Sequence, residues 1–385
     1  MLANTSIAII APLPILLLLF TIGVFNYKHL LPLWTYKRQI KLDFSPNELS
    51  GVDIAVVLVI FLLRSVKHSI LSTYKWICNA RNDVSEVPIS PDEDELSLVM
   101  PFRPTQADLS AYSVAVKNSL VDRDDVQLVS SQLLLLLSAL SEPAMLLLLA
   151  HRSCQIRPLG SVNVRNRFEL LRPDLCTGET LVSFKEAFLT ARLSKHVRTV
   201  KRGFEVDLTV SLNVLSKDST DSIPVFRQNF TILQFARIRA EIIQGRNAAP
   251  DSTISTPAWS ASIPLTVEYN DPTGWARLCK DYNPIHISTI AAKLFGFPGK
   301  LAHGNYIGAL AAKYIAFANA NEPLFMEITF KRPVVVPAHL ELKVSPAAAE
   351  ESQSRLVIIT LFQIISKNKI CVEGRIGQLK YTANA

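Results

Sequence analysis

Residues 281–305 read DYNPIHISTIAAKLFGFPGKLAHGN, and they are the most informative stretch of the chain. Asp281 and His286 lie five positions apart, with Asn283 and Pro284 between them. A residue that precedes proline avoids the helical region, so the backbone here can turn both side chains towards one point. A carboxylate and an imidazole held in this way can share one water and move its proton. The segment therefore predicts a catalytic pair; a salt bridge within the loop or a helix cap is the alternative without catalysis.

The whole segment resembles the signature of MaoC-like dehydratases and (R)-specific enoyl-CoA hydratases, the hydratase 2 family. The resemblance rests on the order and spacing of Asp281, Asn283, Pro284, His286, Ala291, Ala292, Gly296, Phe297, Pro298, Gly299, His303 and Gly304. It implies that residues 259–385 form a hot-dog domain, in which an antiparallel sheet wraps a long helix. It also implies a lyase of fatty-acyl metabolism, a hydratase or dehydratase that interconverts trans-2-enoyl thioesters and (3R)-3-hydroxyacyl thioesters.

The resemblance also implies roles for single residues. Asp281 is the base that removes a proton from water, and His286 positions this water and exchanges its proton. Which of the two protonates C2 stays open. Gly304 is implied as the oxyanion hole, because it precedes a predicted helix whose first N–H groups are unpaired. Asn283 is expected to support the catalytic loop by hydrogen bonds, and His303 to support the turn or the substrate.

Lys280 departs from the family pattern, because many members have glycine before the aspartate. Its ammonium is expected either to face solvent or to contact the negatively charged part of the substrate carrier, CoA or an acyl-carrier protein. Alternatively its charge makes Asp281 a weaker base, because a nearby cation favours the ionised carboxylate. A catalytically weak acyl-thioester binding protein of the same fold therefore stays open as a second function. A thioesterase is disfavoured, since the DxNPxH and HG elements are those of the hydratase branch.

The chain contains a repeat, which appears when Arg172-Pro173 is aligned with Arg332-Pro333. An apolar helix candidate precedes each pair, at 144–152 and at 305–318. Alternating apolar residues predict a strand at 204–214 after the first pair, and the matching position after the second pair is 356–365. A further strand is expected to follow in each half, at 225–233 and 370–379. The repeat also resembles the double hot-dog members of the family. An α+β protein is therefore expected, with two antiparallel sheets that each wrap a central helix.

Two polar segments, 82–95 and 245–258, read as linkers that divide the chain. Residues 96–244 are expected to form a non-catalytic hot-dog, because the segment 108–119 has no DxNPxH counterpart. This half either leaves room for a long acyl chain or only completes the sheet. Residues 259–385 are expected to be the catalytic hot-dog. A homodimer is a further candidate assembly.

Residues 1–81 are expected to be a membrane anchor and a membrane-proximal region. Ile7 to Phe25 is an uncharged run of 19 residues, long enough to cross the hydrocarbon core as a transmembrane helix. No basic residue precedes this run, and those that follow it are Lys28, Lys37, Arg38 and Lys41. The asymmetry predicts that the catalytic part faces the cytosol, at the endoplasmic reticulum. A cleaved signal peptide, or an embedded anchor kinked at Pro12 and Pro14, is the alternative.

Two further apolar runs are assigned to the enzyme or its surface. The run 54–63 is too short to span a bilayer, and it is expected either to lie at the membrane interface or to pack on the enzyme. The run 133–150 is interrupted by Ser141, Glu142 and Pro143, which favours a core helix of the globular part.

The composition disfavours several other classes of protein. The net charge is +7 and the pI is near 9.1, but the basic residues are spread along the chain without an interleaved aromatic pattern, so nucleic acid is not an expected partner. The five cysteines are widely spaced and contain no CxxC pair, which argues against a disulfide scaffold or a zinc site. The reaction that the resemblance implies needs neither a metal nor a redox cofactor.

Overall fold

The computed structural model describes residues 28–77, 95–117, 128, 130–158, 160–184, 186–215, 222–236, 258–315, 322–352 and 355–379. The apolar run 7–25 and nearly all of the two expected linkers lie outside these residues. The transmembrane helix expected there therefore remains a prediction.

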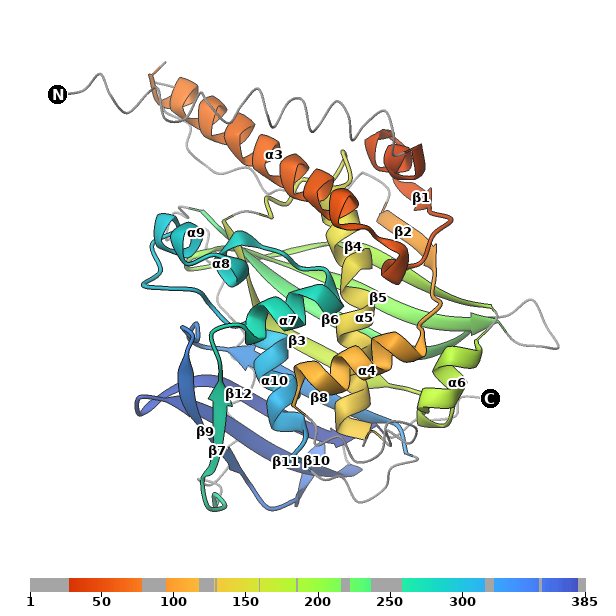
Figure 1. The fold of residues 1–385 in the computed structure, drawn as a ribbon, viewed down its shortest axis with the longest axis vertical. Helices are drawn as coiled ribbons and strands as arrows, with labels where there is room; N and C mark the ends of the chain where they lie inside the picture. Colours follow the sequence, from red (N-terminus) through yellow and green to blue (C-terminus); the bar gives the residue numbers. More distant parts are fainter. Residues whose placement is uncertain are drawn as a thin grey trace.

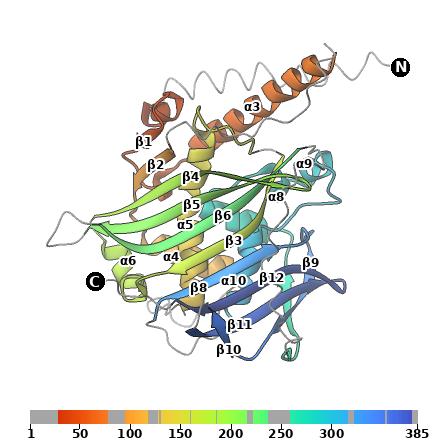
Figure 2. The same ribbon diagram turned by 180° about the vertical axis from the view of Figure 1, so that it is seen from behind.

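One continuous sheet forms the larger part of the described fold (Figures 1 and 2). Its order is β1-β2-β4-β5-β6-β3-β8-β12-β11-β9-β7, and β10 pairs with β11. The strands are β1 (Gln39–Lys41), β2 (Leu96–Pro101), β3 (Ser161–Leu170), β4 (Ala187–Val200), β5 (Gly203–Leu215), β6 (Ser222–Phe235), β7 (Ile263–Val267), β8 (Leu324–Phe330), β9 (Ala338–Val344), β10 (Ala348–Ser352), β11 (Arg355–Ser366) and β12 (Lys369–Gln378). The strands expected at 204–214, 225–233, 356–365 and 370–379 are confirmed as β5, β6, β11 and β12.

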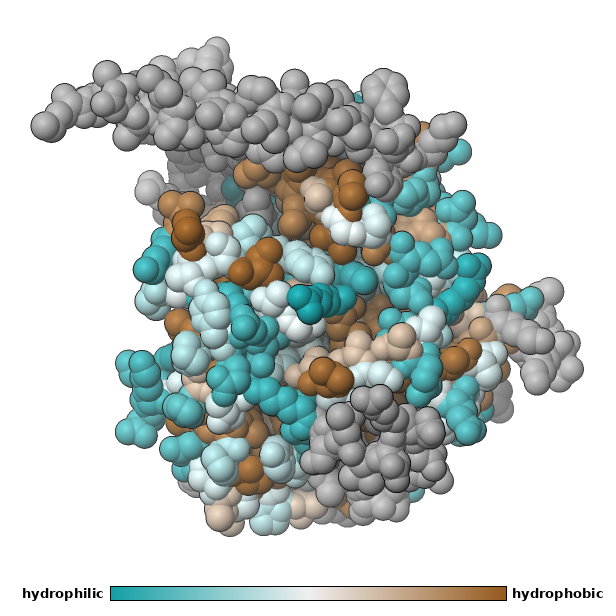
Figure 3. Space-filling model, viewed as in Figure 1, coloured by the Kyte–Doolittle hydropathy of each residue, from teal (hydrophilic) through white to brown (hydrophobic). Residues whose placement is uncertain are grey.

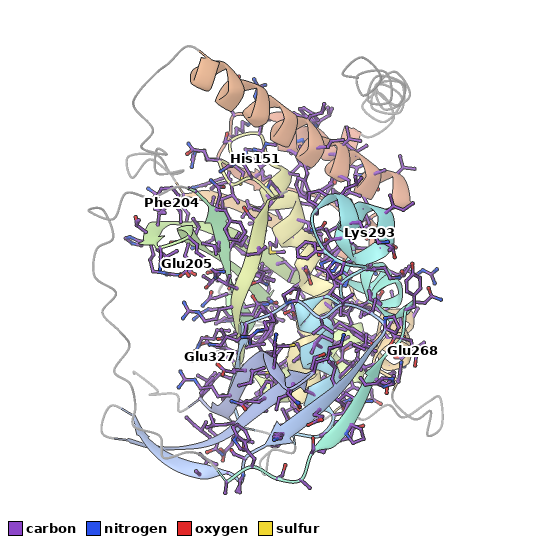
Figure 4. The ribbon with its side chains drawn as sticks, turned by 90° about the vertical axis from the view of Figure 1, so that its left-hand side faces the viewer. His151, Phe204, Glu205, Glu268, Lys293 and Glu327 are labelled. Atoms are coloured by element: carbon purple, nitrogen blue, oxygen red, sulfur yellow. The ribbon has the colours of Figure 1, made fainter. Side chains whose placement is uncertain are left out.

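The expectation of two separate sheets is wrong. The two halves meet at a seam, where β3 of the first half pairs antiparallel with β8 of the second half. The pairing covers six positions, 165–170 against 324–329. Arg167 on this seam bonds Glu327 across it at 2.6 Å, and Arg375 of the next strand bonds the same carboxylate at 2.6 Å. Figure 4 shows Glu327 on the side of the sheet away from the central helices. The two half-sheets therefore share backbone hydrogen bonds and form one curved surface.

Two buried helices, α5 (Ser130–Ala150) and α10 (Gly304–Ala312), lie side by side on the other face of this sheet (Figures 1 and 2). They run antiparallel, because Ser131 Oγ at the start of α5 donates to the Ala312 carbonyl at the end of α10, at 2.9 Å. Gly308 permits α10 to approach β8 closely, since a Cβ at this position would lie 2.6 Å from Ile328 Cδ1. A sheet wrapped around one central helix per half is the double hot-dog arrangement.

Both central helices differ in length from the expectation. The helix expected at 144–152 begins at Ser130, because the leucine-rich stretch before it is helical and Pro143 does not end the helix. The helix expected at 305–318 spans Gly304–Ala312, and residues 316–318 lie outside the described part of the chain. Among the described residues, α5 alone is long and apolar enough to cross a membrane, and nearly all of it is buried inside the fold. The prediction that 133–150 is a core helix is thus confirmed.

The internal repeat is visible in the hydrogen bonds of the two Arg-Pro segments. Leu171 and Arg172 both donate their N–H groups to the Val225 carbonyl, at 2.9 and 3.2 Å. In the second half, Lys331 and Arg332 both donate to the Cys371 carbonyl, at 2.8 and 3.2 Å. The aligned positions therefore form the same local structure in each half.

The globular structure begins well before Leu96, where the sequence placed its start. Residues 28–64 add η1 (Lys28–Trp34), β1, η2 (Pro46–Glu48) and the first half of α3 (Gly51–Ile77) to the body of the protein. The strand β1 pairs in parallel with β2, and Ile40 and Leu42 beside it are buried. These contacts join segments more than fifty residues apart, so no local pattern could indicate them.

The helix α3 packs on α5 through Val57, Ile60 and Phe61, which are buried. The run 54–63 was expected either to lie at the membrane interface or to pack on the enzyme. The structure shows that its buried face packs on the enzyme. Leu62 and Leu63 on the outer side remain exposed, at 41% and 45%.

The remaining helices border the central pair. They are α4 (Gln106–Ala115), η3 (Pro173–Leu175), α6 (Gly178–Ser183), α7 (Asp271–Cys279), α8 (Pro284–Ile287) and α9 (Thr289–Leu294). Thr105 and Asp108 begin α4 with a reciprocal capping box. Trp275 of α7 is fully buried between Tyr112 of α4 and Tyr306 of α10, with ring centroids 6.1 and 5.5 Å away. These aromatic contacts hold α7 against α4 and α10, and the catalytic loop continues from the end of α7.

Arg64 is the residue that fastens α3 to the end of α5, where a helix leaves carbonyl groups unpaired. Its guanidinium donates to the Leu149 carbonyl at 2.5 Å and to the His151 carbonyl at 2.8 Å, and also to those of Arg152 and Cys154. Figure 4 shows His151 directly beneath α3.

We predict that Arg64→Ala lowers the free energy of unfolding by about 1–3 kcal/mol, because several partly buried carbonyls lose a charged donor. Thermal and urea unfolding of the full chain would measure this change. Arg192→Ala is the matched control, since Arg192 forms an exposed ion pair with Glu95 at 3.8 Å and its loss should change stability by less than about 1 kcal/mol. Equal midpoints for the two variants would contradict the anchoring role of Arg64.

Candidate active site

A cavity of about 460 Å³ lies between the two halves of the fold. Its walls come from α3, α5, β6, the loop between α7 and α8, and the start of α10. Leu58 and Phe61 of α3 and Met145 of α5 contribute apolar surface, and Asp281 and His286 belong to the same lining. The cavity therefore combines the residues of the DxNPxH segment with apolar residues that lie far away in the sequence.

The turn that carries Asp281 is built by its own side chains. The Asn283 N–H donates to Asp281 Oδ1 at 3.1 Å, and the Asn283 side chain accepts from the Ile285 N–H at 3.4 Å. Asn283 is the N-cap of α8, and Pro284 is its first residue, where a missing N–H costs nothing. The DYNPIH spacing thus places a short helix directly after the aspartate, and that helix presents His286 to the same cavity.

The hydrogen bond of His286 determines which ring nitrogen is free. Its Nδ1 lies 3.0 Å from the Leu301 carbonyl, which can only accept, so Nδ1 carries the proton. Enclosure by protein lowers the pKa of His286, and the attraction of Asp281 for the protonated ring offsets this only in part. His286 is therefore a neutral imidazole whose Nε2 is available as an acceptor in the cavity.

His303 holds the backbone of Asp281 in place by a hydrogen bond. Its Nε2 donates to the Asp281 carbonyl at 3.0 Å, and its ring stacks on that of His286 with centroids 3.8 Å apart. Burial, and then the neighbouring His286, lower the pKa of His303 well below the ordinary histidine value. His303 is neutral and ties the backbone of the catalytic loop, an arrangement that fits the role of turn support.

Gly304 is the first residue of α10, so its N–H has no acceptor within that helix. The sequence attributed the glycine to close approach of a thioester. The structure adds a steric reason, because a Cβ at this position would lie 2.4 Å from Phe330 Cε1. Any side chain here would have to displace the Phe330 ring on β8.

The ligand atoms of Asp281, His286 and His303 lie within 4.8 Å of one another, a grouping that suits a bound water or a cation. Each histidine already uses one nitrogen on a backbone carbonyl, which leaves His286 Nε2 and His303 Nδ1. The family resemblance favours water between the carboxylate and the imidazole.

Lys280 has a conformational explanation that the sequence did not provide. It ends α7 in the left-handed region, with φ 58° and ψ 11°, where glycine is favoured. Lys280 lines a small separate pocket together with Asn47, Asp108 and Pro143, and it is not among the residues that line the main cavity. The glycine common in the family at this position therefore suits the backbone turn, and the structure does not place Lys280 against a substrate in the cavity.

Glu142 is a cavity residue that the sequence analysis missed. It was considered only as a polar interruption of a core helix, whereas α5 places it in the cavity wall with 6% of its surface exposed. Burial, reinforced by the nearby Asp281 carboxylate, raises the pKa of Glu142 well above its ordinary value. An acid within the leucine-rich run LLLLLSALSEPAMLLLL was the signal that could have indicated it.

Comparison with known proteins places a family match in the second half of the chain. Residues 253–361 match the family model described as MaoC like domain, which spans the catalytic loop and most of the second half. Residues 253–361 are therefore similar to a MaoC-like domain.

Two curated relatives extend the comparison. The 3-hydroxyacyl-thioester dehydratase X of Mycobacterium tuberculosis is 25% identical over 207 residues, which cover 54% of this chain and 67% of that protein. The fatty acid synthase beta subunit pkiC of Emericella nidulans is 35% identical over 75 residues, 19% of this chain and 4% of the subunit.

The crystal structure of a MaoC-like dehydratase from Phytophthora capsici superposes with a TM-score of 0.52 at 17% identity. The superposition covers 75% of this chain and 96% of that one, so the likeness extends over both halves of the fold.

We predict that Lys280→Gly raises the free energy of unfolding by about 1 kcal/mol, because it removes the steric cost of a Cβ in the left-handed region. Lys280→Ala is the matched control, since it removes the ammonium but keeps the Cβ. Urea unfolding of the three proteins would measure the difference. If Lys280→Gly is no more stable than Lys280→Ala, backbone strain at this position is not significant.

Proposed function

We propose that this protein is a hydratase or dehydratase, a lyase that interconverts trans-2-enoyl thioesters and (3R)-3-hydroxyacyl thioesters in fatty-acyl metabolism. The observation that carries the proposal is the convergence of Asp281, the free Nε2 of His286 and the N-terminus of α10 on one apolar cavity. The MaoC-like domain match and the likeness to a 3-hydroxyacyl-thioester dehydratase support the same reaction.

In hydration, Asp281 removes a proton from water, and the water oxygen forms a bond to C3 of the enoyl group. The π electrons of the C2=C3 bond move through C2 to the thioester oxygen, which becomes an enolate. The unpaired N–H at Gly304 and the positive end of the α10 dipole stabilise this charge. The enolate then collapses as C2 takes up a proton from the Asp281–His286 pair, so one water has been added and the enzyme is restored.

The lining of the cavity suits a fatty-acyl thioester. Met145, Phe230 and Phe61 offer apolar contact to an acyl chain. Arg202 and Arg332 are exposed residues of the same lining, where they can attract the phosphate of CoA or of an acyl-carrier protein. The proposed substrate is therefore an acyl-CoA or acyl-carrier-protein thioester.

We predict that Asp281→Asn and His286→Ala each reduce the hydration of crotonyl-CoA and longer 2-enoyl-CoA by at least about 100-fold, the scale of general acid–base catalysis. Loss of absorbance of the conjugated thioester would measure the rate, and circular dichroism would check the fold. Lys293→Ala is the control, because Lys293 lies exposed on α9 (Figure 4). A folded variant that keeps more than about a tenth of the wild-type rate would remove that residue from the mechanism. Tight binding of enoyl-CoA without hydration by the wild-type protein would instead identify an acyl-thioester binding protein.

We further propose that the protein is anchored by residues 7–25 in the endoplasmic reticulum membrane with its catalytic part in the cytosol. Exposed apolar side chains gather at one end of the described fold, on α3 and α9 (Figure 3). They include Leu62, Leu63, Ile290, Leu294 and Phe295. An exposed apolar surface of this kind fits a face that would lie against lipid.

The topology can be tested with an unstructured glycosylation tag placed after Ala385. The natural Asn229-Phe230-Thr231 sequon is uninformative, because it lies within β6 and Phe230 is buried. We expect the tag to remain unmodified and to be digested by protease on intact microsomes. Glycosidase-sensitive mobility of the tag would place the enzyme in the lumen and contradict the cytosolic location.

A further inference from the structure

The first half of the fold, which lacks the DxNPxH motif, places an acid in the cavity. Glu142 belongs to α5, and only 6% of its surface is exposed. It lines the same cavity as Asp281. Burial of a carboxylate is strongly unfavourable unless a cation is paired with it. Within the described part of the chain no Lys, Arg or His forms an ion pair with Glu142, so structural ion pairing does not explain its position.

The antiparallel helices define where Glu142 lies relative to α10. Ser131 of α5 bonds the last carbonyls of α10, and Ser138, two turns later, accepts from Asn305 Nδ2 at 3.2 Å at the other end. Glu142 follows Ser138 by four residues, a rise of about 6 Å along α5. Glu142 therefore lies near the N-terminal end of α10, and its carboxyl interacts with the side chain of Asn305, the residue that follows Gly304.

The surroundings of Glu142 favour its protonated form. Burial and the Asp281 carboxylate raise its pKa well above the ordinary value, while a hydrogen bond from Asn305 only partly opposes them. The other titratable groups nearby are Cys279, His286 and His303; burial raises the pKa of the thiol and lowers the pKa of both imidazoles. None of these three supplies a cation at neutral pH.

A protonated Glu142 has a donor that the protein does not use. Its Oε2 is buried and has no hydrogen-bond partner among the described residues. An apolar site can hold a carboxylic acid neutral so that it donates a hydrogen bond. A buried donor at the edge of a cavity is unfavourable unless a ligand accepts from it, so the position indicates an oxygen acceptor on the substrate.

We propose that Glu142 is a catalytic residue of the hydratase reaction, a neutral acid whose O–H donates to the thioester oxygen beside the N–H of Gly304. The inference rests on the proposed function. As the water oxygen bonds to C3 and the π electrons reach the thioester oxygen, Glu142 strengthens its hydrogen bond to the enolate. It keeps its proton while C2 is protonated by the Asp281–His286 pair. The first half thereby completes the oxyanion hole of the second.

Two variants of the full chain separate this role from the alternatives. Glu142→Gln keeps a neutral donor of similar shape, and its kcat for crotonyl-CoA should stay within about fivefold of wild type, since one donor remains. Glu142→Leu removes the donor, and its kcat should fall about 100-fold, the typical loss of one oxyanion donor. The leucine variant should fold with a thermal midpoint close to that of the wild type, because removal of the unpaired buried Oε2 offsets the loss of the hydrogen bond from Asn305. Glu142→Met serves in its place if leucine does not fit.

A Glu142→Leu variant with near wild-type kcat would overturn the proposal, because the side chain would then have only a structural role. A Glu142→Gln variant as slow as Glu142→Leu would also overturn it, because the reaction would need an ionisable carboxyl.

A binding experiment separates these outcomes from failure of the hydratase function itself. Acetoacetyl-CoA forms an enolate with its own ultraviolet absorption, and donors at the thioester oxygen should increase the enolate fraction of the bound ligand. If the wild-type protein hydrates no enoyl-CoA, the proposed function fails. A lower enolate fraction with Glu142→Leu would still support the donor, and an unchanged fraction would overturn it.

Discussion

The antiparallel pairing of β3 with β8 is the interaction on which the rest of the structure depends. It makes one sheet out of two half-sheets, and it therefore presses α5 and α10 against the same face and against each other. Asn166 on this seam is fully buried, and its Nδ2 donates to Asn305 Oδ1 at 2.6 Å, beside the first turn of α10. The seam thus positions the N-terminus of α10 relative to α5. Without it, the cavity would lose the wall that the first half contributes.

The parts of the site that the sequence predicted are those built by neighbours in the chain. Asn283 turns the backbone through bonds to Asp281 and Ile285, within two residues on either side. The alternating apolar residues of β5 indicate which face of this strand meets the helices. Such patterns are local consequences of burial and of turn chemistry, so they can be read without knowledge of the partner.

The parts that escaped prediction depend on partners far away in the sequence. Arg64 meets the end of α5 across 85 or more residues, and β1 meets β2 across a segment with no strand pattern of its own. The left-handed conformation of Lys280 was hidden because glycine, its usual signal, is absent. The continuous sheet was missed for a related reason, since a strand's sequence shows that it is buried but does not show which edge it joins.

The cavity groups suggest why a duplicated fold would retain a half without the motif. Burial disfavours charge, so it makes His286 and His303 neutral and raises the pKa of Glu142 towards the neutral acid. Asp281, whose side chain is 20% exposed, is the carboxylate assigned as the base. A neutral substrate that becomes an enolate needs a base on one side and uncharged donors on the other. Two carboxyl groups on one short loop would lie close together, and their charges would repel each other strongly. Placing one on each half of the fold lets a shared cavity hold a base and a neutral donor at once, because the packing of α5 against α10 sets their separation.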